Sequence, residues 1–92
     1  MRIKTSELTE QGLMHVLSLP DLSWQTCGPI IEREKIELRY HDVIVAGIWY
    51  RDGIGSDECS HKAIGPTPLV AAMRCYVASK LGNEVDIPKE LL

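Results

Sequence analysis

Residues 67–82 read TPLVAAMRCYVASKLG and carry the start, the stop and the apolar spacing of an α-helix. Thr67 can accept a hydrogen bond from an unpaired amide of the first turn, and Pro68 suits the first helical position because no N–H is needed there. Gly82 is the residue type that commonly follows the last turn of a helix. The stretch therefore predicts a helix over residues 68–81.

This helix would have two unlike faces. One face is a broad apolar stripe, made of Leu69, Val70, Met73, Tyr76, Val77 and Leu81. The opposite face holds only small residues, with Arg74 at its border, and consists of Ala71, Cys75 and Ala78. We expect the apolar stripe to pack against a sheet. The small face either packs inside the domain or allows a partner to approach closely.

Residues 43–50, VIVAGIWY, are apolar and rich in β-branched side chains, so they predict a central strand that is covered on both faces. Residues 36–40 alternate apolar and polar side chains, which is the period of a half-buried strand. Residues 41–42 would form the turn between these strands. Residues 61–64 are a candidate third strand, reached through the turn-rich loop 51–60.

The first third of the chain predicts helical cover for the sheet. Residues 9–19 have helical apolar spacing, with a threonine N-cap at the start and Pro20 ending the helix. Residues 21–28 are predicted as a loop that carries Trp24. Pro29 could then begin a short helix or lie in an extended segment, and the short helix is slightly favoured.

The whole chain, residues 1–92, is predicted as a single α+β domain with a small antiparallel sheet of two to three strands. Two to three helices flank this sheet, in a sandwich-like arrangement. Residues 1–6 would be an edge strand or an extended lead-in, and residues 84–92 a C-terminal tail, since Pro88 disfavours a continued helix. A length of 92 residues suits one domain with a modest core, and its exposed sheet edge makes a homodimer a candidate assembly.

The composition limits the classes of function. The formal net charge is -3, whereas a general nucleic-acid binder concentrates positive charge. The apolar run at 43–50 is far shorter than the roughly twenty residues of a membrane span. Three cysteines without a secretory signal indicate free thiols in a reducing compartment. We therefore expect a cytoplasmic protein without membrane association, and a nucleic-acid-associated module stays only as an alternative that a local basic patch would support.

Metal chemistry has one candidate cluster in the sequence. Cys59 and His61 offer two kinds of zinc ligand, and further ligand types stand at Asp57, Glu58, Cys27 and Cys75. Structural zinc sites favour ligand pairs two to four residues apart, and the chain contains neither CxxC nor HxxxH. No nucleophile or phosphate-binding motif occurs either. We therefore expect no metal, no cofactor and no catalytic residue, and a small metal-dependent hydrolase is the weakest alternative.

Three stretches of the chain resemble one known family. Residues 65–82, GPTPLVAAMRCYVASKLG, look like the C-terminal signature of NinX-like proteins, which are small proteins encoded by lambdoid phages and by prophages of enteric bacteria. Residues 4–9 resemble the family's opening, and Trp24 with residues 28–38 resembles its middle motif. Residues 10–17 depart from the family's usual first helix, and the region before Trp24 is shortened.

The resemblance implies a phage origin, a location in the host cytoplasm and a sheet flanked by helices, and it implies no activity. We expect an accessory protein, not an enzyme, that binds a host or phage protein. The candidate contact residues are Arg74, Trp24, Ala71, Cys75 and Ala78. Arginine and tryptophan are enriched in interface hot spots, although a large aromatic such as Trp24 could equally fill the core.

Overall fold

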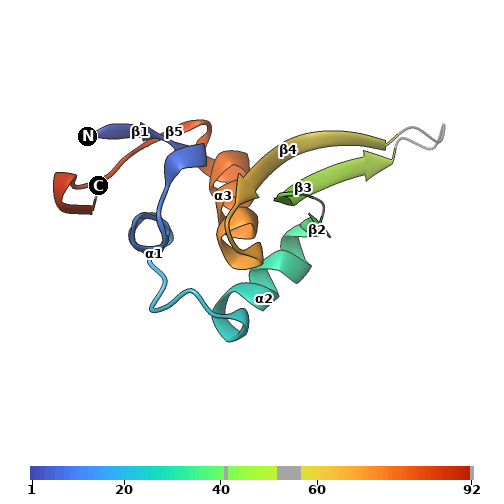
Figure 1. Ribbon diagram of the computed structural model, residues 1–92, viewed down its shortest axis with the longest axis horizontal. Helices are drawn as coiled ribbons and strands as arrows, with labels where there is room; N and C mark the ends of the chain where they lie inside the picture. Colours follow the sequence, from blue (N-terminus) through green and yellow to red (C-terminus); the bar gives the residue numbers. More distant parts are fainter. Residues whose placement is uncertain (41, 52–56, 92) are drawn as a thin grey trace.

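The computed structural model describes residues 1–40, 42–51 and 57–91. These residues form the α+β fold that the sequence predicts, but with two antiparallel sheets where it predicts one (Figure 1). In chain order the elements are β1 (Arg2–Lys4), the 3-10 helix η1 (Thr5–Glu7), α1 (Glu10–Leu17), α2 (Trp24–Glu34), β2 (Glu37–Tyr40), β3 (Ile44–Arg51), β4 (Asp57–Gly65), α3 (Pro68–Leu81), β5 (Glu84–Asp86) and the 3-10 helix η2 (Lys89–Leu91). Residue 41 of the predicted turn and residues 52–56 of the predicted loop lie outside the described residues.

The larger sheet has the strand order β2-β3-β4, with β3 in the centre as predicted. The third strand is longer than residues 61–64, since it begins at Asp57 and therefore includes the end of the predicted loop. The pairing register between β3 and β4 shifts at Ile48/Trp49, which marks a β-bulge.

Among the described residues, helices cover only one face of this sheet, whereas the apolar run of β3 predicts cover on both. Ala46 and Ala63 are buried beneath α3, and Leu38 packs against the same core. On the outer face, Ile64 keeps 49% of its surface exposed. The reason is that α1 and α2 pack against α3 and leave the second face of the sheet without a helix (Figure 1).

Helix α3 lies in the core, and the face that meets the sheet is the small one. Its predicted cap is confirmed, because Thr67 Oγ1 accepts a hydrogen bond from the Val70 amide at 3.2 Å. Ala71 and Cys75 are fully buried, and the Cys75 thiol donates to the carbonyl oxygen of His61 at 3.6 Å. The expectation that the apolar stripe packs on the sheet is wrong, since small side chains let the helix come closer to β4.

The N-terminal helices differ from expectation at their ends. α1 begins after Thr9, whose side chain accepts from the Gly12 amide as predicted, but the helix stops at Ser18, where the backbone is left-handed, before Pro20 is reached. α2 begins at Trp24 and not at Pro29, because Ser23 caps its first turn.

Pro29 therefore lies inside α2, where it removes one backbone hydrogen bond. The residue before a proline usually avoids helical geometry because its Cβ meets the proline ring. Gly28 lacks a Cβ, which relieves this clash and lets the helix run through the proline to Glu34.

The smaller sheet joins the two ends of the described chain. β1 pairs with β5, and the amino group of Met1 donates to the Ile87 carbonyl at 2.9 Å. The amide of Ile87 donates back to the Met1 carbonyl at 2.9 Å. The described part of the predicted tail, residues 84–91, is thus not a tail, because Val85 and Ile87 are buried in the core and Glu84–Asp86 is a strand.

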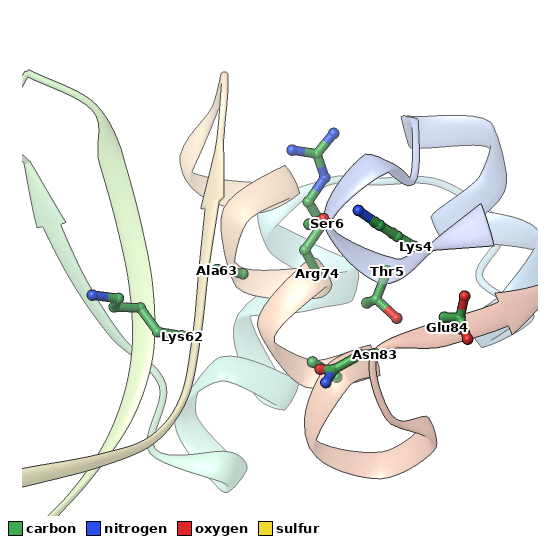
Figure 2. Close-up of a pocket in the computed structure, with 9 residues that line it drawn as sticks. Lys4, Thr5, Ser6, Lys62, Ala63, Arg74, Asn83 and Glu84 are labelled. Carbon is green, nitrogen blue, oxygen red and sulfur yellow. The ribbon is translucent and has the colours of Figure 1, made fainter.

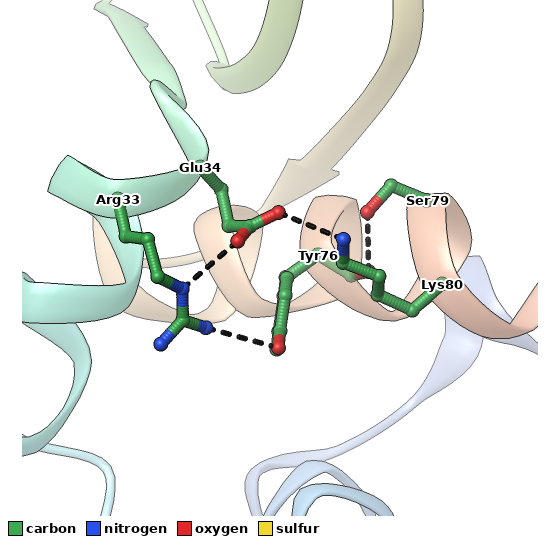
Figure 3. Close-up of polar contacts among 5 residues, drawn as sticks. All are labelled: Arg33, Glu34, Tyr76, Ser79 and Lys80. Atoms are coloured by element: carbon green, nitrogen blue, oxygen red, sulfur yellow. Dashed lines mark hydrogen bonds and ion pairs between the residues drawn. The ribbon is translucent and has the colours of Figure 1, made fainter.

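A cluster of polar side chains joins α2 to α3 (Figure 3). Arg33 donates from Nε to Glu34 at 2.9 Å and from Nη2 to the Tyr76 hydroxyl at 3.2 Å. Lys80 Nζ lies 3.0 Å from the other Glu34 oxygen. The hydrogen bonds from Arg33 and then from Lys80 hold the pKa of the Glu34 carboxyl below its usual value.

Replacing Gly65 by alanine is expected to lower the free energy of unfolding by about 1–3 kcal/mol, because α3 has no room to move. The new Cβ would lie 2.6 Å from the Ala71 nitrogen and 2.9 Å from its Cα, which are backbone atoms. Urea denaturation measures the change. Glu32→Ala, an exposed change on α2, is the control. We expect it to cost less than about 1 kcal/mol, and equal costs at both positions would contradict the tight contact.

Glu34→Gln is expected to destabilise the protein at neutral pH by an amount that shrinks in acid. A carboxyl whose folded-state pKa is lowered stabilises the fold above its unfolded value, near 4.5, and this stability is lost as the pH falls through the folded value. Urea denaturation at a series of pH values measures the difference between variant and parent. Glu32→Gln, an exposed change on the same helix, serves as the control. A difference that stays constant with pH would show that Glu34 acts through packing alone.

Candidate functional site

A cavity of about 360 Å³ lies between the two sheets and above α3 (Figure 2). We call it the β4 groove. One wall is the N-terminal segment, the other is β4, and α3 and the α3–β5 connection complete it. The lining residues are Lys4, Thr5, Ser6, Lys62, Ala63, Arg74, Ala78, Asn83 and Glu84.

The N-terminal wall of the groove is fixed by Thr5, which is buried. Its hydroxyl donates to the Gly82 carbonyl at 2.7 Å, and its amide donates to the Asn83 carbonyl at 2.7 Å. The neighbouring Lys4 is exposed, and its side chain extends toward Ser6 and Arg74 (Figure 2). Within the described chain the Lys4 ammonium has no ion pair or hydrogen bond, so it is free to bind an anionic group.

Arg74 closes one end of the groove. Its Nε donates to the Leu8 carbonyl and its Nη1 to the Ile64 carbonyl, both at 2.9 Å. These two bonds tie the N-terminal segment to the end of β4. A guanidinium has five N–H donors, so three remain without an acceptor among the described residues. Burial lowers the pKa of Arg74, but an arginine keeps its charge at neutral pH.

The β4 wall presents mainly backbone to the groove. Successive side chains of a strand point to opposite faces, and here Ala63 is buried under the helix whereas Lys62 is exposed. Figure 2 shows the Lys62 side chain extending to the far side of β4 from Arg74. Within the described sheet, β4 pairs with β3 on one edge only. The groove thus follows the unpaired edge of a strand.

The structure separates the five candidate contact residues into three groups. Arg74 and Ala78 line the β4 groove. Ala71 and Cys75 have no exposed surface, so the alternative in which the small face packs inside the domain holds for them. Trp24 lies elsewhere, on the first turn of α2, with 54% of its surface exposed. It is therefore a surface residue, although the sequence left a core position open.

Of the metal-ligand candidates, Cys27, His61 and Cys75 have described side chains. Among the residues whose side chains are described, no group of three or more His, Cys, Asp and Glu is arranged to hold a metal ion. Cys27 is buried, and that burial raises the pKa of its thiol. The side chain of Cys59, with those of Asp57 and Glu58, lies outside the described residues, so the proposed pair with His61 stays untested.

No helix in the described part of the chain has both the length and the apolar character to cross a membrane.

The family model described as "Bacteriophage P22, NinX" matches residues 3–80, which is most of the chain. The chain belongs to this family. The resemblance carried by residues 65–82, 4–9 and 28–38 is thereby confirmed. A search of curated proteins found no match.

The NinX match includes Lys4, Trp24 and Arg74 but stops before Asn83 and Glu84. Sequence reasoning missed these last two residues and Lys4 as lining residues of one site. The only available signal was the alternation of apolar and charged residues over 84–87, which is the period of a strand.

Arg74→Ala is expected to lower the free energy of unfolding by about 2–3 kcal/mol, because two backbone carbonyls lose a charged donor. Urea denaturation measures this cost. The matched control is Arg2→Ala, which removes two exposed ion pairs, to Glu84 at 3.8 Å and Asp86 at 3.6 Å. Exposed ion pairs contribute about 0–1 kcal/mol, so we expect the control to change the free energy of unfolding by about 1 kcal/mol or less. Equal costs for the two arginines would mean that Arg74 does not clamp the groove.

Proposed function

We propose that this NinX-family protein is a phage accessory protein that acts by binding a host or phage protein, without catalysis of its own. The observation that carries the proposal is the exposure of Trp24, 54% of whose surface is open to solvent. A tryptophan is usually mostly buried, and exposed tryptophans are enriched at the energetic centres of protein interfaces. The host cytoplasm is the proposed location.

The local structure around Trp24 orders the first turn of the helix that carries the indole. Asp21 accepts hydrogen bonds from Thr26 Oγ1 at 2.6 Å and from Ser23 Oγ at 2.7 Å, and the bond from Thr26 does most to lower the pKa of Asp21. Ser23 in turn caps the helix that begins at Trp24. One turn further along α2, Cys27 is fully buried and anchors the helix to the core. A helix turn that is already ordered loses little conformational freedom when a partner binds.

The β4 groove also suits binding better than catalysis. Its lining offers a free ammonium, a guanidinium and an amide, which are donors for an anionic ligand. Among its described lining residues there is no histidine or cysteine to act as a base or nucleophile, and Glu84 is the one carboxylate.

Trp24→Ala is expected to abolish recovery of a protein partner from host cells infected with a NinX-encoding phage. The measurement is affinity capture of the tagged protein at two salt concentrations, followed by mass spectrometry. Tyr40→Ala is the matched control, because Tyr40 is an aromatic with 61% exposure on a different element. We expect Tyr40→Ala to retain the partner.

A partner retained equally by both variants would remove Trp24 from the proposal. Salt-sensitive recovery of nucleic acid in place of a protein would favour the nucleic-acid-associated alternative, because phosphate contacts release counterions.

A further inference from the structure

We propose that the β4 groove binds an extended peptide segment carrying an acidic side chain, which adds as a strand to the free edge of β4 and places its carboxylate beside Lys4 and Arg74. The inference rests on the proposed binding function and names the chemistry of the partner. It uses a different surface from Trp24, so the two can be tested apart.

The shape of the groove suits an extended peptide. The edge of a sheet presents backbone donors and acceptors, and extended peptides bind such edges by adding a strand. At Lys62 and Ala63 the unpaired edge of β4 faces a cavity of about 360 Å³. This volume lies at the lower end of the range for ligand cavities, so it suits a short segment of chain. Ala78 lines the groove from α3, where its small side chain leaves the cavity open.

The charges at one end of the groove suit an acidic side chain. Lys4 has no partner in the described chain, and Arg74 keeps three N–H donors after bonding to Leu8 and Ile64. Figure 2 shows the Lys4 side chain extending toward Arg74, so both cations lie at one end of the groove. A single carboxylate placed there would accept charge-assisted hydrogen bonds from both, and these are the stronger kind.

The carboxylate in the groove favours a peptide over a polyanion. The Glu84 carboxylate also lines the groove, on the other side of Lys4 from Arg74 (Figure 2). A nucleic acid would bring successive phosphates past this carboxylate and toward a protein whose net charge is -3. A peptide with one acidic residue places its negative charge at the Lys4 end and a neutral residue beside Glu84.

Both walls of the groove are held in place. Thr5 ties the N-terminal wall to the end of α3, and Arg74 ties that wall to β4. The bond from Arg74 also occupies the Ile64 carbonyl, so an added strand must stop before that residue. The groove is thus preorganised, and a bound peptide would lie beside Lys62 and Ala63.

The first test selects ligands from a surface-displayed library of random octapeptides, using the full chain as bait. We expect enrichment of peptides with alternating β-branched residues and one Asp or Glu at a fixed position. The best peptide is then synthesised with a fluorescein label, and its affinity is measured by fluorescence anisotropy. No enrichment, or enrichment of basic peptides, would overturn the proposal.

Two variants test the role of Lys4. Lys4→Gln should lower the affinity for the selected peptide by about tenfold, since it removes a charged hydrogen-bond donor. Lys4→Glu should reverse the preference, so that the same peptide with lysine in place of its acidic residue binds better. Lys89→Gln removes an exposed lysine outside the groove and should leave the affinity unchanged. Equal loss in Lys4→Gln and Lys89→Gln would mean that only overall charge matters.

Backbone methylation of the peptide tests strand addition itself. In an added strand, alternate amides face the sheet. N-methylation of one alternating set should therefore lower the affinity at least tenfold, whereas methylation of the other set should have little effect. If both sets are tolerated, the peptide does not pair with β4.

The result separates this inference from the proposed function. Trp24→Ala should leave peptide affinity unchanged. If Trp24 proves necessary for partner capture but no peptide shows the expected behaviour, the binding module stands and the groove proposal fails. A single-stranded oligonucleotide provides the remaining comparison. If it binds, and if Lys4→Gln lowers its affinity more than the affinity of the peptide, the groove binds phosphate and the proposal is overturned.

Discussion

Where α3 crosses the end of β4, a Cβ added to Gly65 would come within 2.6 Å of the Ala71 backbone nitrogen. This close approach requires a glycine on the strand and small residues on the helix, and it fixes the height of α3 above the sheet. Arg74 follows Ala71 by one turn and reaches the Ile64 carbonyl only because the helix lies this near to the strand. The clamp that closes the groove therefore depends on a contact between two of the smallest residues in the chain.

Packing around α3 also explains the one-sided sheet. The larger side chains of the helix face away from the sheet, toward α1 and α2, where Tyr76 meets Arg33. Helices α1 and α2 thus pack against α3. The domain has three layers, which are the larger sheet, α3, and the outer helices α1 and α2. The second face of the sheet keeps exposed apolar residues such as Ile64.

Much of the fold could be predicted from local signals. The caps at Thr9 and Thr67 and the central position of β3 followed from residue type and spacing, and the family followed from the resemblance of residues 65–82, 4–9 and 28–38. The orientation of α3 could not, because both of its faces are apolar and periodicity alone does not say which one meets a sheet. The start of α2 was missed because Pro29 is a stronger local signal than the Ser23 cap, and the exception depends on Gly28.

The candidate site was predicted only in part. Arg74 and Ala78 stood out on the helix, and Trp24 stood out by type, but Lys4 and Glu84 gain their roles from the pairing of β1 with β5. That pairing is a contact between the two ends of the chain, and no local pattern reports such a contact.

The pairing of β1 with β5 affects the order in which the two proposed binding surfaces form during synthesis of the protein. Closing a contact between distant segments is entropically costly and comes late in folding. One wall of the groove is supplied by residues 4–6 and its far corner by Asn83 and Glu84. A nascent chain still lacking its last strand would display Trp24 on an early helix but would have no finished groove, so the two surfaces would mature at different times on the ribosome.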